Sequence, residues 1–231
     1  MFELTELGNF PPRYNIAPTQ PILTVGVNAA GVRDAHLVRW GLIPHWVKNP
    51  DDFTLIINAR SETAATKASF KTALRHRRVL IPASGFYEWH RPEDKSLPKQ
   101  PYWIRKRGGD PVCFGGLIET WMGKDGSELD TGCILTTHSN EQIGNIHHRM
   151  PVVIQPEDFE RWLDCKSNGP KEIEKLMQPV QNDFFEAIRI GEAVNKVGNS
   201  GPDIQKPGEV TSPVSPKNKT SKKDDGQMDL F

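Results

Sequence analysis

The sequence predicts an α+β fold, a single domain with a mainly antiparallel β core flanked by helices. Short apolar runs rich in β-branched and aromatic residues recur along the first 140 residues, and Gly, Pro and Asn turns separate them, which is typical of strands. Helical patterns are few and do not alternate regularly with the strands, so a doubly wound sheet is not indicated. A chain of 231 residues, 36% of them hydrophobic, can bury one substantial core.

The first two predicted strands cover residues 21–27 and 35–40, with a turn at 28–31 between them. The same apolar and β-branched pattern returns later in the chain. It predicts further strands at 78–82, 86–89, 102–106, 112–120 and 133–137.

A helical pattern runs from 61 to 78, where Phe70 and Leu74 lie four residues apart and basic residues gather toward the end. Pro156 and Pro170 each suit the first turn of a short helix. The two helices would carry apolar faces made of Phe159, Trp162 and Leu163, and of Ile173, Leu176 and Met177.

Composition limits the class of protein. From about residue 199 the large apolar residues nearly vanish, so we predict a domain at 1–198 and a disordered tail at 199–231. No apolar run is long enough for a membrane span, and no signal peptide is evident. Three widely spaced cysteines indicate a reducing, cytoplasmic setting. Basic and acidic residues balance at 29 each, so nucleic-acid binding requires a local basic surface.

Three short segments hold the residue types of one reactive site, an amide at Asn58, a carboxylate at Glu88 and an imidazole at His147. This mixture suits proton transfer, with Glu88 and His147 as the acid/base groups. Arg60 and Arg149 lie in the same segments and suit phosphate contacts. No Cys, Ser or Lys in these segments is placed as an obvious nucleophile.

Each of these residues also has an ordinary structural explanation. A lone Glu in a strand commonly faces water, whereas an inward-facing Glu88 among aromatics would have a raised pKa. Asn58 and Arg60 share one face of an extended segment, where either is able to brace a turn. Adjacent His147 and His148 would point to opposite faces of a strand. No metal site is indicated, since no H-E-x-x-H or spaced Cys/His set occurs, and no cofactor is indicated.

A basic stripe at helical spacing is formed by Lys67, Lys71, Arg75 and Arg78. A solvated helix face is the ordinary explanation of such a stripe, and a surface that follows phosphates is the functional one. Aromatic residues able to stack on bases strengthen the functional explanation. These aromatic candidates are Trp40, Trp46 and Phe86.

Residues from about 10 to 199 resemble the SRAP family, the SOS response-associated peptidases regarded as abasic-site processing proteins. The resemblance is carried by PRYNIAPTQ, WGLIPHW, INARSETA, IPASGFYEW, CILTTHSN and IHHRMPVVI, in the family's order. It implies a compact α+β fold with a basic channel for single-stranded DNA. It also implies a reactive cysteine directly after the initiator methionine, whose amine and thiol condense with the aldehyde of an abasic site to a Schiff base and then a thiazolidine.

Matched by motif, the resemblance assigns catalytic roles to Asn58, Glu88 and His147. It assigns DNA contacts to Arg60, Arg149, Trp46 and Pro18, and the basic stripe adds Lys67 and Lys71. The chain begins Met1-Phe2-Glu3 where the family has Met-Cys-Gly-Arg, and residues 2–7 resemble the end of the family's first helix. Either the start was assigned downstream of the true one, which we favour, or the chain is a homologue without its nucleophile. In both cases we expect no crosslinking by the chain as written.

Two other functions fit the same residues. A non-catalytic module for single-stranded DNA would use the same arginines and aromatics. A thiol peptidase would need Cys113 or Cys133 paired with His147, but both cysteines lie in apolar runs where burial is expected.

The last five residues suggest a protein partner. Gln227, Leu230 and Phe231 resemble the bacterial sliding-clamp-binding motif, in which Gln and a Leu-Phe pair dock into an apolar cleft. A flexible tether would then concentrate the DNA-binding domain at replication forks. Short linear motifs also arise often by chance.

Overall fold

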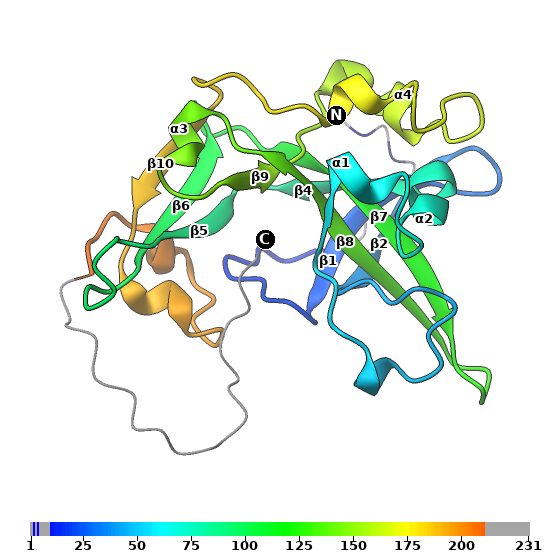
Figure 1. Cartoon of the computed structure of the whole chain (residues 1–231), viewed down its shortest axis with the longest axis horizontal. Coiled ribbons are helices and arrows are strands. Elements are labelled where there is room, and N and C mark those ends of the chain that lie inside the picture. The colour runs from blue at the N-terminus through cyan, green and yellow to red at the C-terminus, as the bar shows by residue number, and fades with distance from the viewer. Residues whose placement is uncertain (1, 3, 5–9, 211–231) are drawn as a thin grey trace.

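The computed structural model of the protein describes residues 2, 4 and 10–210, which form two β-sheets with short helices around them (Figure 1). The predicted α+β fold class is confirmed. The smaller sheet lies on the left in Figure 1, and helices gather above the larger sheet on the right.

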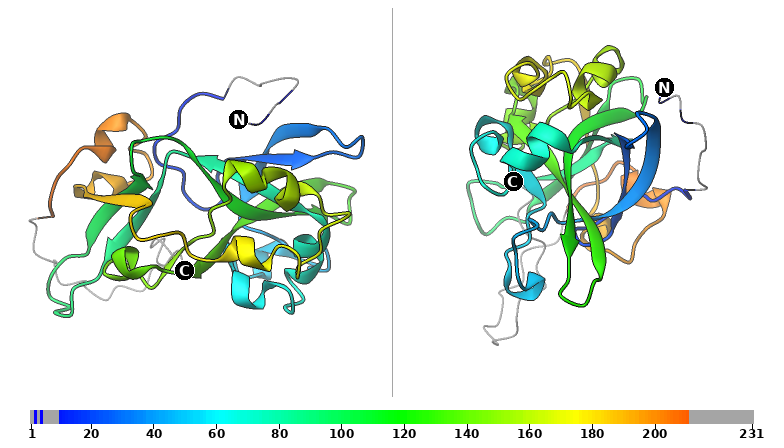
Figure 2. Two further views of the ribbon diagram at one scale, coloured as in Figure 1. Left: turned by 90° about the horizontal axis from the view of Figure 1, so that it is seen from above. Right: turned by 90° about the vertical axis from the view of Figure 1, so that its right-hand side faces the viewer.

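The larger sheet has the strand order β2-β1-β4-β7-β8-β3, with β9 added to β8. Strand β2 also pairs with β8 through Arg39 and Trp40, which closes the sheet into a barrel. In the right-hand view of Figure 2 the blue strands β1 and β2 stand beside the green strands β7 and β8. The seven strands are β1 (Pro21–Val27), β2 (Arg33–Trp40), β3 (Asn58–Arg60), β4 (Arg78–Ala83), β7 (Val112–Met122), β8 (Glu128–His138) and β9 (Arg149–Pro151).

Most neighbours in this sheet are antiparallel, and only β2 and β3 run parallel to β8. In β4, alternate residues enter two different cores. Leu80 packs with Trp162 on the side of the helices, whereas Val79 and Ile81 face the smaller sheet. The indole of Trp162 also donates to the Val79 carbonyl at 2.9 Å. Burial on both faces explains why this strand reads as a continuous apolar run.

The smaller sheet is antiparallel in the order β10-β6-β5, with β5 (Phe86–His90), β6 (Gln100–Lys106) and β10 (Phe185–Arg189). Gly85 precedes β5, and a Cβ atom there would lie 2.3 Å from the Ile104 carbonyl oxygen. Only glycine permits this close approach. Fully buried Ile104 and Phe185 pack this sheet against the barrel.

The helices are all short. They are α1 (Ser61–Ala64), α2 (Lys71–His76), α3 (Glu141–Gly144), α4 (Phe159–Leu163) and the 3-10 turns η1 (Pro50–Asp52), η2 (Pro156–Asp158), η3 (Glu174–Met177), η4 (Glu192–Asn195) and η5 (Pro202–Gln205). The helix expected at Pro156 is therefore found, and the one expected at Pro170 is a 3-10 turn.

The continuous helix predicted from 61 to 78 is wrong, because turns at 65–70 separate α1 from α2. The Thr66 hydroxyl donates to the Thr63 carbonyl at 3.1 Å, which offers the backbone a local alternative to a helical bond. The chain then leaves α2 and enters β4 at Arg78.

Packed structure continues past residue 198, the predicted end of the domain. Buried Ile204 joins Ile190 and Val194 in a small third core, and the Gln205 amide donates to the Tyr87 hydroxyl at 2.9 Å. Residues 199–210 thus pack on the domain instead of belonging to the expected tail. Residues 211–231 lie outside the described residues, and so does the predicted clamp-binding motif.

Near the start of the chain, the ring of Phe2 stacks on Phe159 at 5.6 Å between centroids, and Leu4 packs against the same core. The helix end expected at residues 2–7 falls mostly outside the described residues. Among the described helices, none has the length and apolar character needed to cross a membrane.

Candidate active site

Glu88 lies in the middle of β5 with its side chain turned inward, 4% exposed. Its Oε2 atom accepts from the Trp89 backbone N–H at 3.3 Å. Its Oε1 atom lies 3.9 Å from Nδ1 of His147 and has no hydrogen-bonding partner among the described residues. The ordinary solvent-facing explanation of this glutamate is therefore wrong.

Burial raises the pKa of Glu88 to about 8, although the Trp89 N–H and the charge of Arg91 act in the opposite direction. A carboxyl group with such a pKa is mostly protonated near pH 7. It is able to donate a proton in a neutral solution, which an exposed glutamate cannot do.

His147 lies in the loop before β9 and is half-buried. Burial lowers its pKa, the hydrogen bond with the Arg149 backbone opposes this, and the charges of His148, Arg91 and Arg149 lower it further. Nδ1 lies 3.1 Å from the Arg149 backbone N–H and 3.3 Å from the Arg149 carbonyl oxygen, so the Arg149 backbone holds this ring nitrogen in either neutral tautomer. The neutral imidazole complements the protonated carboxyl of Glu88.

The rings of His147 and His148 lie only 4.3 Å apart, at an interplanar angle of 42°. The expectation that they point to opposite faces is wrong, because this stretch is a bend and not a strand.

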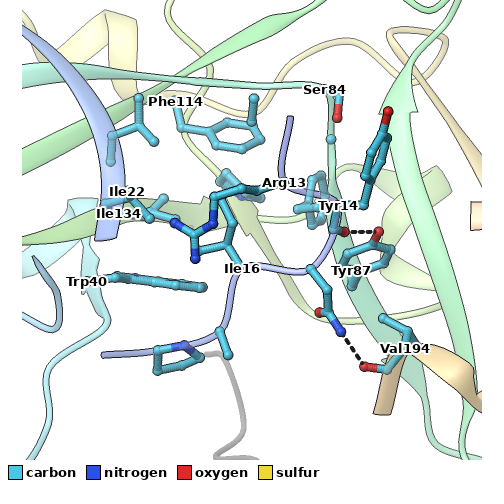
Figure 3. Close-up of a pocket in the computed structure, with 18 of the residues that line it drawn as sticks. Arg13, Tyr14, Ile16, Ile22, Trp40, Ser84, Tyr87, Phe114, Ile134 and Val194 are labelled. Carbon is cyan, nitrogen blue, oxygen red and sulfur yellow. Dashed lines mark hydrogen bonds between the residues drawn. The ribbon is translucent and has the colours of Figure 1, made fainter. Parts of the chain in front are cut away.

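Asn58 opens β3 and lines a cavity of about 660 Å³ between the two sheets (Figure 3). Its Nδ2 atom is buried and has no hydrogen-bonding partner among the described residues. Pro18 lines the same cavity. The walls are mainly apolar and aromatic and include Trp40, Phe86, Tyr87, Trp103 and Phe114.

The rim of this cavity is fixed by hydrogen bonds from distant segments. The Tyr87 hydroxyl donates to the Tyr14 carbonyl at 2.6 Å, and the Asn15 amide donates to the Val194 carbonyl at 3.1 Å, both visible in Figure 3. The proline-rich stretch after residue 10 therefore serves as a wall of the cavity.

The two arginines of the motif segments differ in exposure. Arg60 ends β3 and is exposed, with no ion pair to the described residues. Arg149 is 3% exposed, and its guanidinium holds Glu62 at 2.8 and 2.9 Å and the Thr136 carbonyl at 2.6 Å. The phosphate contact expected of Arg149 does not fit this geometry, because the side chain is buried and both of its terminal nitrogens are engaged inside the protein.

The basic stripe is also discontinuous. Lys67 and Lys71 are exposed, but Arg75 donates to the Cys165 carbonyl and Arg78 is buried. The Arg78 guanidinium donates to four backbone carbonyls, those of Leu74, Trp162, Asp164 and Asn168. It fastens α2 to the α4 region and offers nothing to a ligand.

Of the three aromatic candidates for base stacking, only Trp46 is exposed, at 50%. Trp40 is buried and its indole donates to the Ile57 carbonyl at 2.9 Å. Phe86 packs edge-on against Phe114.

Two residues near the site were not predicted from the sequence. Arg91 follows β5 directly, and its charge lowers the pKa of both Glu88 and His147. Its position three residues after Glu88 is the sequence signal by which Arg91 could have been predicted. The second residue is Glu62, and no sequence signal links it to Arg149, 87 residues away.

The two cysteines named for the thiol-peptidase alternative are both buried. Cys113 and Cys133 are 3% and 0% exposed. Burial raises the pKa of Cys113 to about 12 and also raises the pKa of Cys133. Both thiols therefore stay protonated, which disfavours the thiol-peptidase alternative.

Comparison with known proteins identifies relatives over most of the chain. The family described as "SOS response associated peptidase (SRAP)" matches residues 2–197. Abasic site processing protein YoqW of Bacillus subtilis is 39% identical over 85% of this chain and 87% of its own length. Abasic site processing protein YedK of Escherichia coli is 32% identical over 84% of each.

A vertebrate protein and a crystal structure are also similar. Abasic site processing protein HMCES of Gallus gallus is 30% identical over 94% of this chain and 72% of its own length. A crystal structure of a Bacteroides thetaiotaomicron protein superposes with a TM-score of 0.71 at 29% identity, over 85% of this chain and 82% of that one. On the extent of the family match and the identity to these relatives, the chain belongs to the SRAP family.

Proposed function

We propose that this protein processes abasic sites in single-stranded DNA during the DNA damage (SOS) response. The observation that carries the proposal is the buried Glu88–His147 pair at 3.9 Å, in a chain whose relatives are named abasic site processing proteins. A buried acid/base pair is what condensation of an amine with a sugar aldehyde requires.

The proposed chemistry needs a proton donor and a proton acceptor near pH 7. An N-terminal cysteine amine adds to the ring-opened aldehyde, water leaves to give a Schiff base, and the thiol adds to the C=N bond to give a thiazolidine. Protonated Glu88 suits the departure of water, and neutral His147 suits proton removal. Asn58, with an amide hydrogen directed at no protein acceptor, would hold a sugar oxygen.

DNA would be held by groups that the fold leaves exposed. These are Arg60, Lys67, Lys71 and Trp46, with Pro18 at the cavity wall. Cationic side chains contact phosphates and Trp46 stacks on a base. We assign Arg149 a positioning role in place of a phosphate contact, because its guanidinium is engaged by Glu62.

The printed sequence has no cysteine after Met1, so two forms of the protein test the proposal. The first is the chain as printed, and the second carries Met-Cys-Gly-Arg ahead of Phe2. Each is mixed with single-stranded DNA containing one abasic site and run on a denaturing gel. We expect both to bind the DNA and only the second to form an adduct.

Variants of the second form test the acid/base pair. Glu88→Gln and His147→Ala should slow adduct formation by about 10²–10⁴ while DNA affinity stays within a few-fold. Glu93→Gln, an exposed glutamate just beyond β5, is the matched control and should react at the parental rate. An adduct from the chain as printed would point to an internal nucleophile. A parental rate for Glu88→Gln would refute its catalytic role.

A further inference from the structure

We propose that Glu62 is a positioning residue of this site, which holds the His147 loop in register with β3 through the buried guanidinium of Arg149. The inference rests on the proposed function, because it concerns the same acid/base pair. Glu62 itself is not proposed to touch DNA.

The contact is a two-point ion pair. Nη1 of Arg149 lies 2.8 Å from Oε1 of Glu62, and Nη2 lies 2.9 Å from Oε2. Such parallel bonds fix orientation as well as distance. His138 adds a weaker contact, with Nε2 at 3.4 Å from Glu62 Oε1.

This ion pair joins two segments that are far apart in the sequence. Glu62 lies in α1, which directly follows the strand carrying Asn58 and Arg60. Arg149 opens β9, and its backbone N–H holds Nδ1 of His147 at 3.1 Å. A displacement of Arg149 would therefore move the acceptor geometry of the imidazole directly.

Both segments also meet at one residue of β8. Thr136 is paired with Arg60 of β3 on one side and with Pro151 of β9 on the other. Nη2 of Arg149 donates to the Thr136 carbonyl at 2.6 Å and lies 3.2 Å from its hydroxyl. Helix α1 and strands β8 and β9 are thus held together by one guanidinium.

The charge balance makes Glu62 necessary to this arrangement. The Arg149 side chain is 4% exposed, and a buried cation without its partner is strongly unfavourable. Burial opposes ionisation of Glu62, but its hydrogen bond with Arg149 and the charges of Arg149 and His138 lower its pKa below the ordinary value. Glu62 is therefore an anion at neutral pH and cancels the charge of Arg149.

The charged and titratable groups that face His147 are Glu88, His148, Arg91 and Arg149. The charge of Arg149 lowers the pKa of His147. Removal of the Glu62 charge leaves Arg149 uncompensated, so the pKa of His147 should fall further. Loss of the two-point contact should also loosen the Nδ1 contacts with the Arg149 backbone and change the ratio of the two ring tautomers.

The test is nitrogen NMR of the histidine rings in the full 231-residue chain, with the His147 signals assigned from a His147→Ala variant. In Glu62→Gln, which preserves shape and removes charge, we expect a lower His147 titration midpoint and a changed ratio of the two ring tautomers. Glu62→Asp keeps the charge on a shorter stem, so it should keep the parental midpoint and alter only the tautomer ratio.

Glu186→Gln is the matched control. It removes the partner of Arg105 in the smaller sheet, where the 2.6 Å contact joins side chains that are 31% and 33% exposed. It should leave the His147 signals unchanged. Parental His147 signals in Glu62→Gln would overturn the inference.

A kinetic readout separates this inference from the function it rests on. In the form carrying Met-Cys-Gly-Arg, Glu62→Gln should slow adduct formation by about 10- to 100-fold, the scale of a small misplacement of a reacting group, with DNA affinity unchanged. If His147→Ala reacts normally while Glu62→Gln still shifts the His147 signals, the proposed function fails and the positioning contact stands. If only His147→Ala is slow, the positioning role fails.

Discussion

Replacement of Glu88 by Gln should change how the stability of the protein depends on pH. The pKa of this carboxyl rises from an ordinary 4.5 to about 8 because the side chain is buried. In the unfolded chain the group ionises near the ordinary value. Between about pH 4.5 and pH 8 the folded state therefore holds one proton more than the unfolded state, and stability falls as pH rises through this window.

The size of the effect follows from the two pKa values. One pH unit is worth about 1.4 kcal/mol, so full ionisation of Glu88 costs the folded state about 5 kcal/mol as an order of magnitude. The interval from about pH 6 to pH 8 is accessible without extreme conditions. Over this interval the free energy of unfolding falls by about 2 kcal/mol. Glutamine mimics the protonated carboxyl and does not titrate. The Glu88→Gln variant should lose none of this stability.

Urea unfolding of both proteins at pH 6 and pH 8 measures the difference. Other titrating groups are shared by the two chains and cancel in the comparison, provided the denaturant slopes agree. We expect the free energy of unfolding of the parent to fall relative to Glu88→Gln by about 2 kcal/mol over this interval. Parallel pH profiles would show that Glu88 is ionised in the folded protein, and the argument for it as a proton donor would then be lost.

Three further outcomes test other parts of the molecule. Arg60→Ala should weaken binding of single-stranded DNA and lower the slope of log affinity against log salt by about 0.7, whereas Lys124→Ala on the β7–β8 turn should leave both unchanged. Phe185→Ala removes a fully buried ring between the two sheets. It should lower the free energy of unfolding by about 3–5 kcal/mol in urea titrations. A peptide of the last residues should bind a bacterial sliding clamp, and its double Leu230→Ala, Phe231→Ala version should not; equal binding of both would refute the motif.

The sequence was informative where local pattern decides structure. Most strands were predicted within a few residues, since turns separate apolar runs whose faces are buried. The helix from 61 to 78 failed because spacing alone does not register the competing Thr66 side-chain bond. Ile204 was counted with the tail because one apolar residue in a polar stretch gives no pattern, although it packs with Ile190 and Val194.

The motif segments contain the candidate site residues but do not give the direction of each side chain. Glu88 and His147 do meet, although only tertiary packing shows that Glu88 faces inward. For Arg149 the sequence indicated a contact with a ligand, but the structure shows a contact inside the protein. Its charge indicated a phosphate contact, yet Glu62 engages both of its terminal nitrogens. Partners of a buried ion can be distant in sequence, so charge alone does not identify which arginine faces a ligand.

Some of the unsatisfied polar atoms belong to the candidate site. Of the buried side-chain atoms without a hydrogen-bonding partner among the described residues, Asn58 Nδ2, Glu88 Oε1 and Arg149 Nε lie in the three motif segments, whereas Asp34 Oδ1, Thr63 Oγ1 and Gln142 Oε1 do not belong to the candidate site. Each such atom costs the folded state about 1–3 kcal/mol. A catalytic role is one physical reason for a protein to retain such a group. Under the proposed function, a bound sugar gains hydrogen bonds from the amide of Asn58 and the carboxyl of Glu88, which have unused hydrogen-bonding capacity in the fold.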